Sequence, residues 1–113
     1  MLLRYTLAMS STAKLSYTSA MILASIDAGA VYGLSIMELT GLPSGTVYPA
    51  MRRLEAAKLI TAQWEDERIA TRELRPARKY YKLNRAGKEM LVAVRERYPL
   101  LQQMKPVPEV QSK

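Results

Sequence analysis

The feature that most restricts the fold is a pair of helical patterns, over residues 34–41 and 44–57, with only Leu42 and Pro43 between them. Gly41 closes the first pattern at the position where a backbone leaving a helix takes a positive φ. Pro43 prevents that helix from continuing. Two helices joined by so short a turn predict a helix-turn-helix unit. The residues of its first helix expected to face the core are Ile36 and Leu39.

The second helix of this unit is predicted to begin at Ser44, or at Thr46 if Pro49 has to lie in its first turn. Serine and threonine are both good N-caps, and a first-turn proline costs little because the N–H groups there have no helical partner. Apolar residues recur at helical spacing, at Val47, Ala50, Met51, Leu54 and Ala57. The opposite face carries Gly45, Tyr48 and Arg52, flanked by Thr46, Pro49 and Arg53. Both arginines are therefore predicted to be exposed.

Two further helices flank the unit. Residues 16–29 form the first, capped by Ser16 or Thr18, and residues 85–98 form the last, capped by Asn84. The apolar stripe of the last helix comprises Met90, Leu91, Val94 and Tyr98. This stripe and the first helix are the candidates for dimerisation, and packing against the chain's own core is the alternative.

Two strands are predicted between the helices, at residues 59–64 and 78–83, where apolar and polar residues alternate. Residues 65–77 between them are predicted to be a charged loop. Trp64 is assigned to the core, because tryptophan is highly buried on average, with stacking on a ligand as the alternative. Acidic residues begin the loop and basic residues dominate its later part and the start of the second strand, at Arg68, Arg72, Arg75, Arg78 and Lys79.

The predicted order is helix, helix, helix, strand, strand, helix. The fold class is therefore mainly α with a small two-stranded β-wing, in the winged helix-turn-helix arrangement of the α+β class. One domain is expected over residues 16–104, with a flexible segment at 1–15 and a disordered tail at 105–113.

The composition of the chain limits the classes of partner and of functional site that it can have. The 113 residues carry a net charge of +7, which favours phosphate backbones, anionic membranes or acidic proteins as partners. The chain has no Cys and no His, which argues against disulfides, zinc sites and the commonest catalytic groups. No catalytic residue, metal site or cofactor is expected, and a cytoplasmic location is the simplest reading. The apolar residues are needed for the core, so membrane binding is not expected.

Double-stranded DNA fits the basic helix best, because the major groove admits one α-helix whose N-terminal part faces the base edges. Arg52 is placed to reach a guanine or a phosphate, with an ion pair to Glu55 as the alternative. Tyr48 lies on the same face of the helix as Arg52, so contact of Tyr48 with DNA is favoured over burial in the core. The predicted contacts from the wing to phosphate are Arg72, Arg75, Arg78 and Lys79.

Two stretches, "GLPSGTVYPAMRRLEAAKLI" and "ARKYYKLNRAGKEML", resemble the PadR family of winged-helix transcriptional regulators. Gly45 to Glu55 match that family's recognition helix, and Lys79 to Gly87 match the second wing strand and the helix after it. The pair Tyr32–Gly33 and the acidic residues after Trp64 match as well, so the resemblance covers roughly residues 20–95.

The resemblance implies a homodimer that represses transcription from a palindromic operator. Many relatives are released from DNA by small aromatic or hydrophobic compounds, so it also implies a small-molecule effector, which we expect between protomers. The residues it places on DNA are Ser44, Gly45, Thr46, Tyr48, Pro49 and Arg52, with Arg53 on the backbone. Two features depart from the pattern: the chain stops soon after Pro99, as in the short branch of the family, and the wing loop is longer than usual.

Two other classes remain open. A winged helix can dock on proteins in a larger assembly, although the basic face of the second helix lacks the exposed apolar anchors typical of docking helices. The chain could also bind DNA without sequence preference, as an architectural protein driven by charge.

Overall fold

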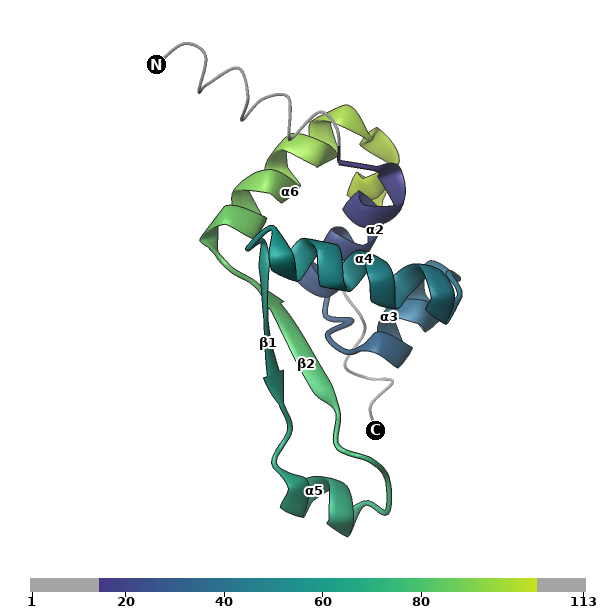
Figure 1. Cartoon of the computed structure of the whole chain (residues 1–113). Coiled ribbons are helices and arrows are strands. Elements are labelled where there is room, and N and C mark those ends of the chain that lie inside the picture. Colours follow the sequence, from purple (N-terminus) through teal and green to yellow (C-terminus); the bar gives the residue numbers. More distant parts are fainter. Residues whose placement is uncertain (1–14, 104–113) are drawn as a thin grey trace.

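The computed structural model describes residues 15–103, so the predicted segments at 1–15 and 105–113 lie outside the described residues apart from Leu15. A helical body carries a projecting two-stranded ribbon, the wing (Figure 1). In chain order the elements are α2 (Tyr17–Asp27), α3 (Gly33–Thr40), α4 (Ser44–Ala56), β1 (Ile60–Trp64), α5 (Glu67–Arg72), β2 (Lys79–Leu83), α6 (Arg85–Arg97) and the 3-10 turn η1 (Pro99–Gln103). The predicted order is confirmed, with α5 added.

Helix α2 is the centre of the core. The Ser16 hydroxyl oxygen caps it by accepting a hydrogen bond from the Ser19 N–H, at 3.0 Å. Ile22 and Leu23 are both fully buried on neighbouring sides of the helix, which lets α2 pack against α3, α4, α6 and β2 at once. The body is thus built around the first predicted helix.

The turn between α3 and α4 follows the sequence pattern. Gly41 has a φ of 76°, and its N–H donates to the Met37 carbonyl at 2.8 Å. Helix α4 begins at Ser44, but its N-cap is Pro43, without a side-chain hydrogen bond, so neither serine nor threonine caps it. Leu39 was expected in the core and is instead 39% exposed, because it lies in the last turn of α3 and borders the core. Ala57, also among the residues of the predicted apolar face, is exposed because it lies just beyond the end of α4.

The wing pairs β1 with β2 in an antiparallel register that runs from Ile60 opposite Leu83 to Trp64 opposite Lys79. Ile60 and Leu83 are buried at its base. Trp64 is 64% exposed, so its assignment to the core is wrong. It shares the face of Ile60, as the alternation predicted, but it ends the strand beyond the point where the helical body covers that face.

The segment predicted as a charged loop contains the short helix α5 at the tip of the wing (Figure 1). Asp66 caps this helix by accepting a hydrogen bond from the Arg68 N–H at 2.9 Å. Ala70 is the one buried residue of this helix. The sequence did not predict this helix, because the segment is mostly charged and has one N-cap and a single small buried residue.

The last helix packs on the chain's own core. Asn84 caps α6 as predicted, by accepting a hydrogen bond from the Gly87 N–H at 2.9 Å. Leu91 and Val94, two members of the stripe predicted for dimerisation, are 2% and 0% exposed within one chain. Their burial within one chain favours the alternative of packing on the core for these two, and dimerisation through the stripe stays a prediction. No helix among residues 15–103 is long and apolar enough to cross a bilayer.

Candidate nucleic-acid interface

The outward face of α4 carries the residues predicted to meet DNA. Ser44, Gly45, Tyr48, Arg52 and Arg53 are exposed, and Thr46 and Pro49 are half-buried. The exposure of both arginines is as predicted, and contact with DNA stays a prediction for every one of these residues. The inward face buries the apolar residues Val47, Ala50, Met51 and Leu54, which fixes the rotation of α4 and therefore which side chains it presents.

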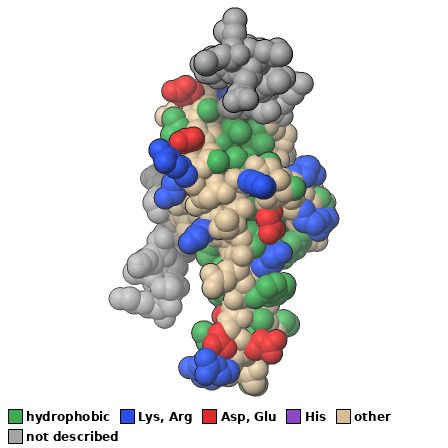
Figure 2. Space-filling view, turned by 60° about the vertical axis from the view of Figure 1, so that its left-hand side comes forward, with side chains coloured by type: hydrophobic (Ala, Val, Ile, Leu, Met, Phe, Trp, Pro, Cys, Tyr) green, Lys and Arg blue, Asp and Glu red, His purple; other side chains and the backbone are tan. Residues whose placement is uncertain are grey.

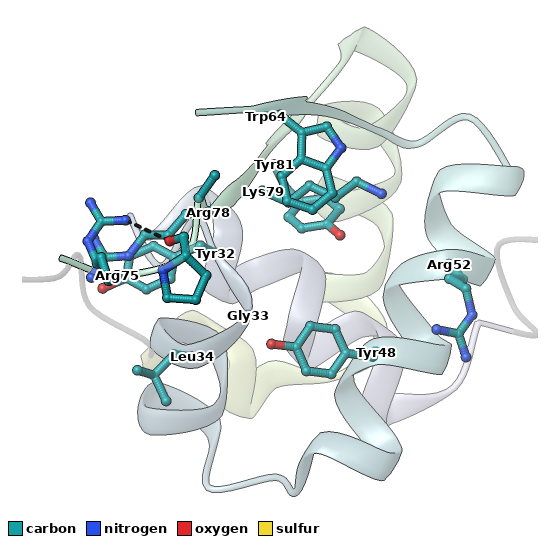
Figure 3. A pocket seen from close by; sticks show the side chains of 12 residues that line it. Tyr32, Gly33, Leu34, Tyr48, Arg52, Trp64, Arg75, Arg78, Lys79 and Tyr81 are labelled. Atoms are coloured by element: carbon teal, nitrogen blue, oxygen red, sulfur yellow. Dashed lines mark hydrogen bonds between the residues drawn. The ribbon is translucent and has the colours of Figure 1, made fainter. Parts of the chain in front are cut away.

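Tyr48 is positioned by a glycine of the preceding helix. Its side chain is 41% exposed, and its hydroxyl end lies over Gly33 at the start of α3 (Figure 3). A Cβ on Gly33 would lie 2.2 Å from the Tyr48 Oη atom. The notch left by this glycine is thus what allows the tyrosine ring to lie here, a role that the sequence signalled only through the Tyr32–Gly33 match.

Arg52 does not form the ion pair with Glu55 that was the alternative to DNA contact. Within residues 15–103, no carboxylate lies within 4.0 Å of the Arg52 or Arg53 guanidinium. Glu55, the predicted alternative partner, lies 3.8 Å from the Lys79 Nζ atom. The guanidinium of Arg52 therefore keeps its charge and its donors available for an anion.

One wing arginine, the half-buried Arg75, is engaged in an ion pair. Arg75 makes a two-pronged ion pair with Glu65, at 2.7 Å and 2.9 Å. Glu65 also accepts a hydrogen bond from the Arg78 N–H at 3.2 Å. The hydrogen bond from Arg75 is the main cause that lowers the pKa of Glu65 from 4.5 to about 2. Arg75 thus pins the wing strands together beside α5, and its predicted contact with phosphate stays a prediction.

The other cations of the wing differ in the contacts that their charged groups make. The Arg78 guanidinium lies 4.2 Å from the ring centroid of Tyr32, a cation–π arrangement. Lys79 is shared between Glu55 and the rings of Trp64 and Tyr81. Arg72 is exposed in the last turn of α5, at the wing tip, where side chains of both charges gather (Figure 2).

A cleft of about 620 Å³ lies between the helix-turn-helix unit and the wing. It brings together five of the predicted DNA-contact residues, namely Tyr48, Arg52, Arg75, Arg78 and Lys79. Arg53, Arg72 and the first residues of α4 lie outside it. The remaining lining residues were not predicted as site residues: Tyr32, Gly33, Leu34, Trp64, Pro76, Ala77 and Tyr81. They come from three separate parts of the chain, so no spacing in the sequence could have grouped them.

Comparisons with known proteins agree on one family. The family model described as "Transcriptional regulator PadR-like family" matches residues 22–93. A PadR family transcription regulator from Clostridium difficile R20291 is similar in structure, with a TM-score of 0.65 and 25% identity over 78% of this chain and 93% of that one. A PadR-like transcription factor from Bacteroides fragilis has a TM-score of 0.63 and 22% identity over 85% and 93%. No curated protein matches the chain in sequence. The predicted winged-helix fold is thereby confirmed.

Proposed function

Because the chain belongs to the PadR-like family of transcriptional regulators, we propose that it binds a palindromic operator as a homodimer and represses transcription there. DNA binding and transcriptional regulation belong to the family as a whole, which is one of regulators rather than enzymes. The two-fold operator, the homodimer and repression are proposed for this chain.

The observation that carries the proposal is the outward face of α4. Tyr48 and Arg52 lie one helical turn apart on it, and no carboxylate of the described chain neutralises the arginine. An exposed helix with an unpaired arginine fits the major groove, where a bidentate arginine recognises guanine. The first turn of α4 adds free N–H groups that can bind phosphate, next to Ser44, Gly45 and Thr46.

The wing supports the same orientation. It extends from the C-terminal end of α4 (Figure 1), so it can follow the DNA backbone beside the groove that α4 enters. Arg72 is an exposed charge on the wing, and contacts of such charges with phosphate position a protein without reading the DNA sequence.

For the homodimer we propose the outer side of α6. Val92 is 62% exposed there, while Met90 and Tyr98 are half-buried. Figure 2 shows hydrophobic side chains on the surface at the height of α6. Leu100, just beyond that helix, is also exposed. A second copy would cover these residues, and they replace Leu91 and Val94 as the surface members of the predicted interface.

The first experiment is selection of binding sites from a random duplex pool by the full chain. We expect an enriched inverted repeat, weakened and less sharply defined for Arg52→Ala but unchanged for Arg85→Ala, an arginine whose side chain is 94% exposed on α6. Binding without enrichment would instead indicate an architectural protein, and no binding at moderate salt would favour a protein-docking role.

The dimer is tested separately by sedimentation. We expect Val92→Glu to give monomers, while Ala86→Glu, which adds the same charge on another exposed part of α6, leaves the dimer intact. If both variants sedimented as dimers, the α6 interface would be wrong.

A further inference from the structure

The two edges of the wing differ in what covers them. On the edge formed by β2, the Tyr81 N–H donates to the Val31 carbonyl at 2.8 Å, so the backbone of Tyr81 points away from β1. Tyr81 lies opposite Ala62 of β1. Opposite residues of an antiparallel pair direct their backbone groups either both toward each other or both outward. Ala62 therefore points its N–H and C=O outward, on the edge that β1 forms.

This outer edge of β1 is able to pair with another strand. Ile60 and Trp64, two residues to either side of Ala62, direct their backbone groups the same way, and within residues 15–103 no strand other than β2 pairs with β1. Proteins commonly protect such an edge with a charged residue, a proline or a bulge. The sequence of β1, "ITAQW", has no charge and no proline, and its register with β2 is unbroken. The wing also projects from the helical body (Figure 1), which leaves room beside it.

The backbone and side chains of β1 are complementary to a second copy of the same strand. In an antiparallel pair centred on Ala62, Ala62 lies opposite the partner's Ala62, and Ile60 lies opposite the partner's Trp64. Every residue that points outward then meets one that points outward, as the ladder of hydrogen bonds requires. Trp64, which is 64% exposed, comes to lie beside the partner's Ile60, and such pairs of an aromatic and a β-branched residue stabilise sheets.

The charges at the two ends of the strand are complementary in the same register. Two residues beyond Ile60 and Trp64, Lys58 lies opposite the partner's Asp66, and the two-fold symmetry repeats this pair. Lys58 is exposed, and within residues 15–103 no carboxylate lies within 4.0 Å of its ammonium group. The Asp66 carboxylate contacts Arg68 but its side chain is 44% exposed. Opposite charges across neighbouring strands favour pairing.

We propose that the β1 edges of two copies pair in this antiparallel register and join two wings into one four-stranded sheet. This contact goes beyond the proposed function, because it is a second surface for self-association, separate from α6. It joins dimers to one another where the α6 interface also forms. Only one short strand from each copy takes part, so the pairing is weak in dilute solution, where Val92→Glu is expected to be a monomer.

The first test is sedimentation of the full chain carrying Val92→Glu, from micromolar to millimolar concentration. We expect a reversible equilibrium between monomer and dimer. Ala62→Pro, added to this chain, removes an N–H that β2 does not use, and should weaken association by about tenfold or more. If Val92→Glu stays a monomer throughout, or if Ala62→Pro leaves association unchanged, the proposal is wrong. A monomer would leave the edge to an extended segment of another protein.

Charge variants in the same chain test the register without changing the backbone. Lys58→Glu places like charges opposite each other and should weaken association several-fold, whereas Lys82→Glu makes the same change of charge on the neighbouring strand and should not. Asp66→Asn keeps a residue able to cap α5 and, combined with Lys58→Glu, should restore part of the association. Equal effects of Lys58→Glu and Lys82→Glu would refute the register.

A single introduced cysteine tests the same contact directly, because the chain has none of its own. Cα atoms of a hydrogen-bonded antiparallel pair lie about 5.5 Å apart, within the range of about 4.4–6.8 Å found for disulfides. Ala62→Cys should therefore oxidise to a covalent dimer much faster than Lys82→Cys, whose copies would lie three strand spacings apart, about 14 Å. Equal rates would overturn the proposal. None of these measurements involves DNA, so their outcome is independent of whether the proposed function holds.

Discussion

Replacing Gly33 by alanine should reduce DNA binding without unfolding the protein. The added Cβ would lie 2.2 Å from Oη, 2.5 Å from Cζ and 2.6 Å from Cε1 of Tyr48. Carbon atoms in contact are normally about 3.5–4.0 Å apart, so the ring has to move by more than about 1 Å. The atoms that clash are the far end of a side chain that is 41% exposed, and the ring can turn outward into solvent.

The effects on stability nearly cancel. Turning out a ring that is only partly buried loses about 1 kcal/mol of apolar burial, and alanine in place of glycine in a helix gains up to about 1 kcal/mol. The free energy of unfolding should therefore stay within about 1 kcal/mol of the wild type. DNA affinity has no such compensation. If the proposed contact of Tyr48 with DNA is one hydrogen bond, its loss costs about 1–2 kcal/mol, or roughly 5- to 30-fold in affinity.

A double-mutant cycle separates the two effects. Gly33→Ala, Tyr48→Ala and the double variant are compared with the wild type by thermal unfolding and by anisotropy with the selected operator. Once Tyr48 is gone, Gly33→Ala should have no further effect on affinity and should raise the melting temperature. The reasoning is refuted if Gly33→Ala weakens DNA binding equally in both backgrounds, or leaves it unchanged in the wild type.

Four other changes have defined outcomes. Gly87→Ala places a Cβ 2.0 Å from the Leu59 carbonyl oxygen; because backbone cannot swing aside, urea unfolding should show a loss of about 2–3 kcal/mol, and a loss below about 1 would contradict the clash. Arg52→Ala should cost about 1–3 kcal/mol of DNA affinity and relax one base preference in site selection; an unchanged motif would refute the docking of α4. Arg72→Ala should weaken all duplexes alike and flatten the plot of log affinity against log salt by about one unit, whereas a sequence-dependent loss would assign it to a base. The pKa of Glu65 is lowered from 4.5 to about 2, so its stabilisation is complete above pH 4.5 and is lost as pH falls toward 2; Glu65→Gln should abolish this part of the pH dependence of the melting temperature, and an unaltered profile would contradict it.

The helical part of the fold could be predicted because its signals are local. Gly41 and Pro43 mark the turn, and Asn84 caps the last helix, each through one or two hydrogen bonds to near neighbours. Burial of the inward face of α4 follows directly from its helical period. Such features depend on residues a few positions apart, so they can be recognised directly in the sequence.

The sequence is a poorer guide where contacts between residues far apart in the chain decide the outcome. Trp64 has the alternation of a core residue, but the extent of the helical body determines where the core ends. An apolar stripe on α6 would suit a dimer interface as well as a core, and it is the packing of α6 against α2, β2 and η1 that buries Leu91 and Val94. In the sequence nothing distinguishes Arg75 from the other basic residues of the wing. Its ion-pair partner Glu65 lies ten positions away, so the pair could not be recognised from spacing.

Residues 31–33 connect the parts that the proposed DNA contacts require to act together. The Val31 carbonyl accepts a hydrogen bond from the Tyr81 N–H of the wing at 2.8 Å. Tyr32 forms an isolated bridge with Tyr80 and carries the Arg78 guanidinium on its ring. Gly33 holds the ring of Tyr48 on α4.

One short segment thus contacts the wing, begins α3 and lies against Tyr48 of α4. A shift of the wing relative to α4 would have to break these contacts, which are of different kinds and lie on both sides of the cleft. The width of the cleft is therefore coupled to the placement of Tyr48 on the face of α4 that is proposed to bind DNA.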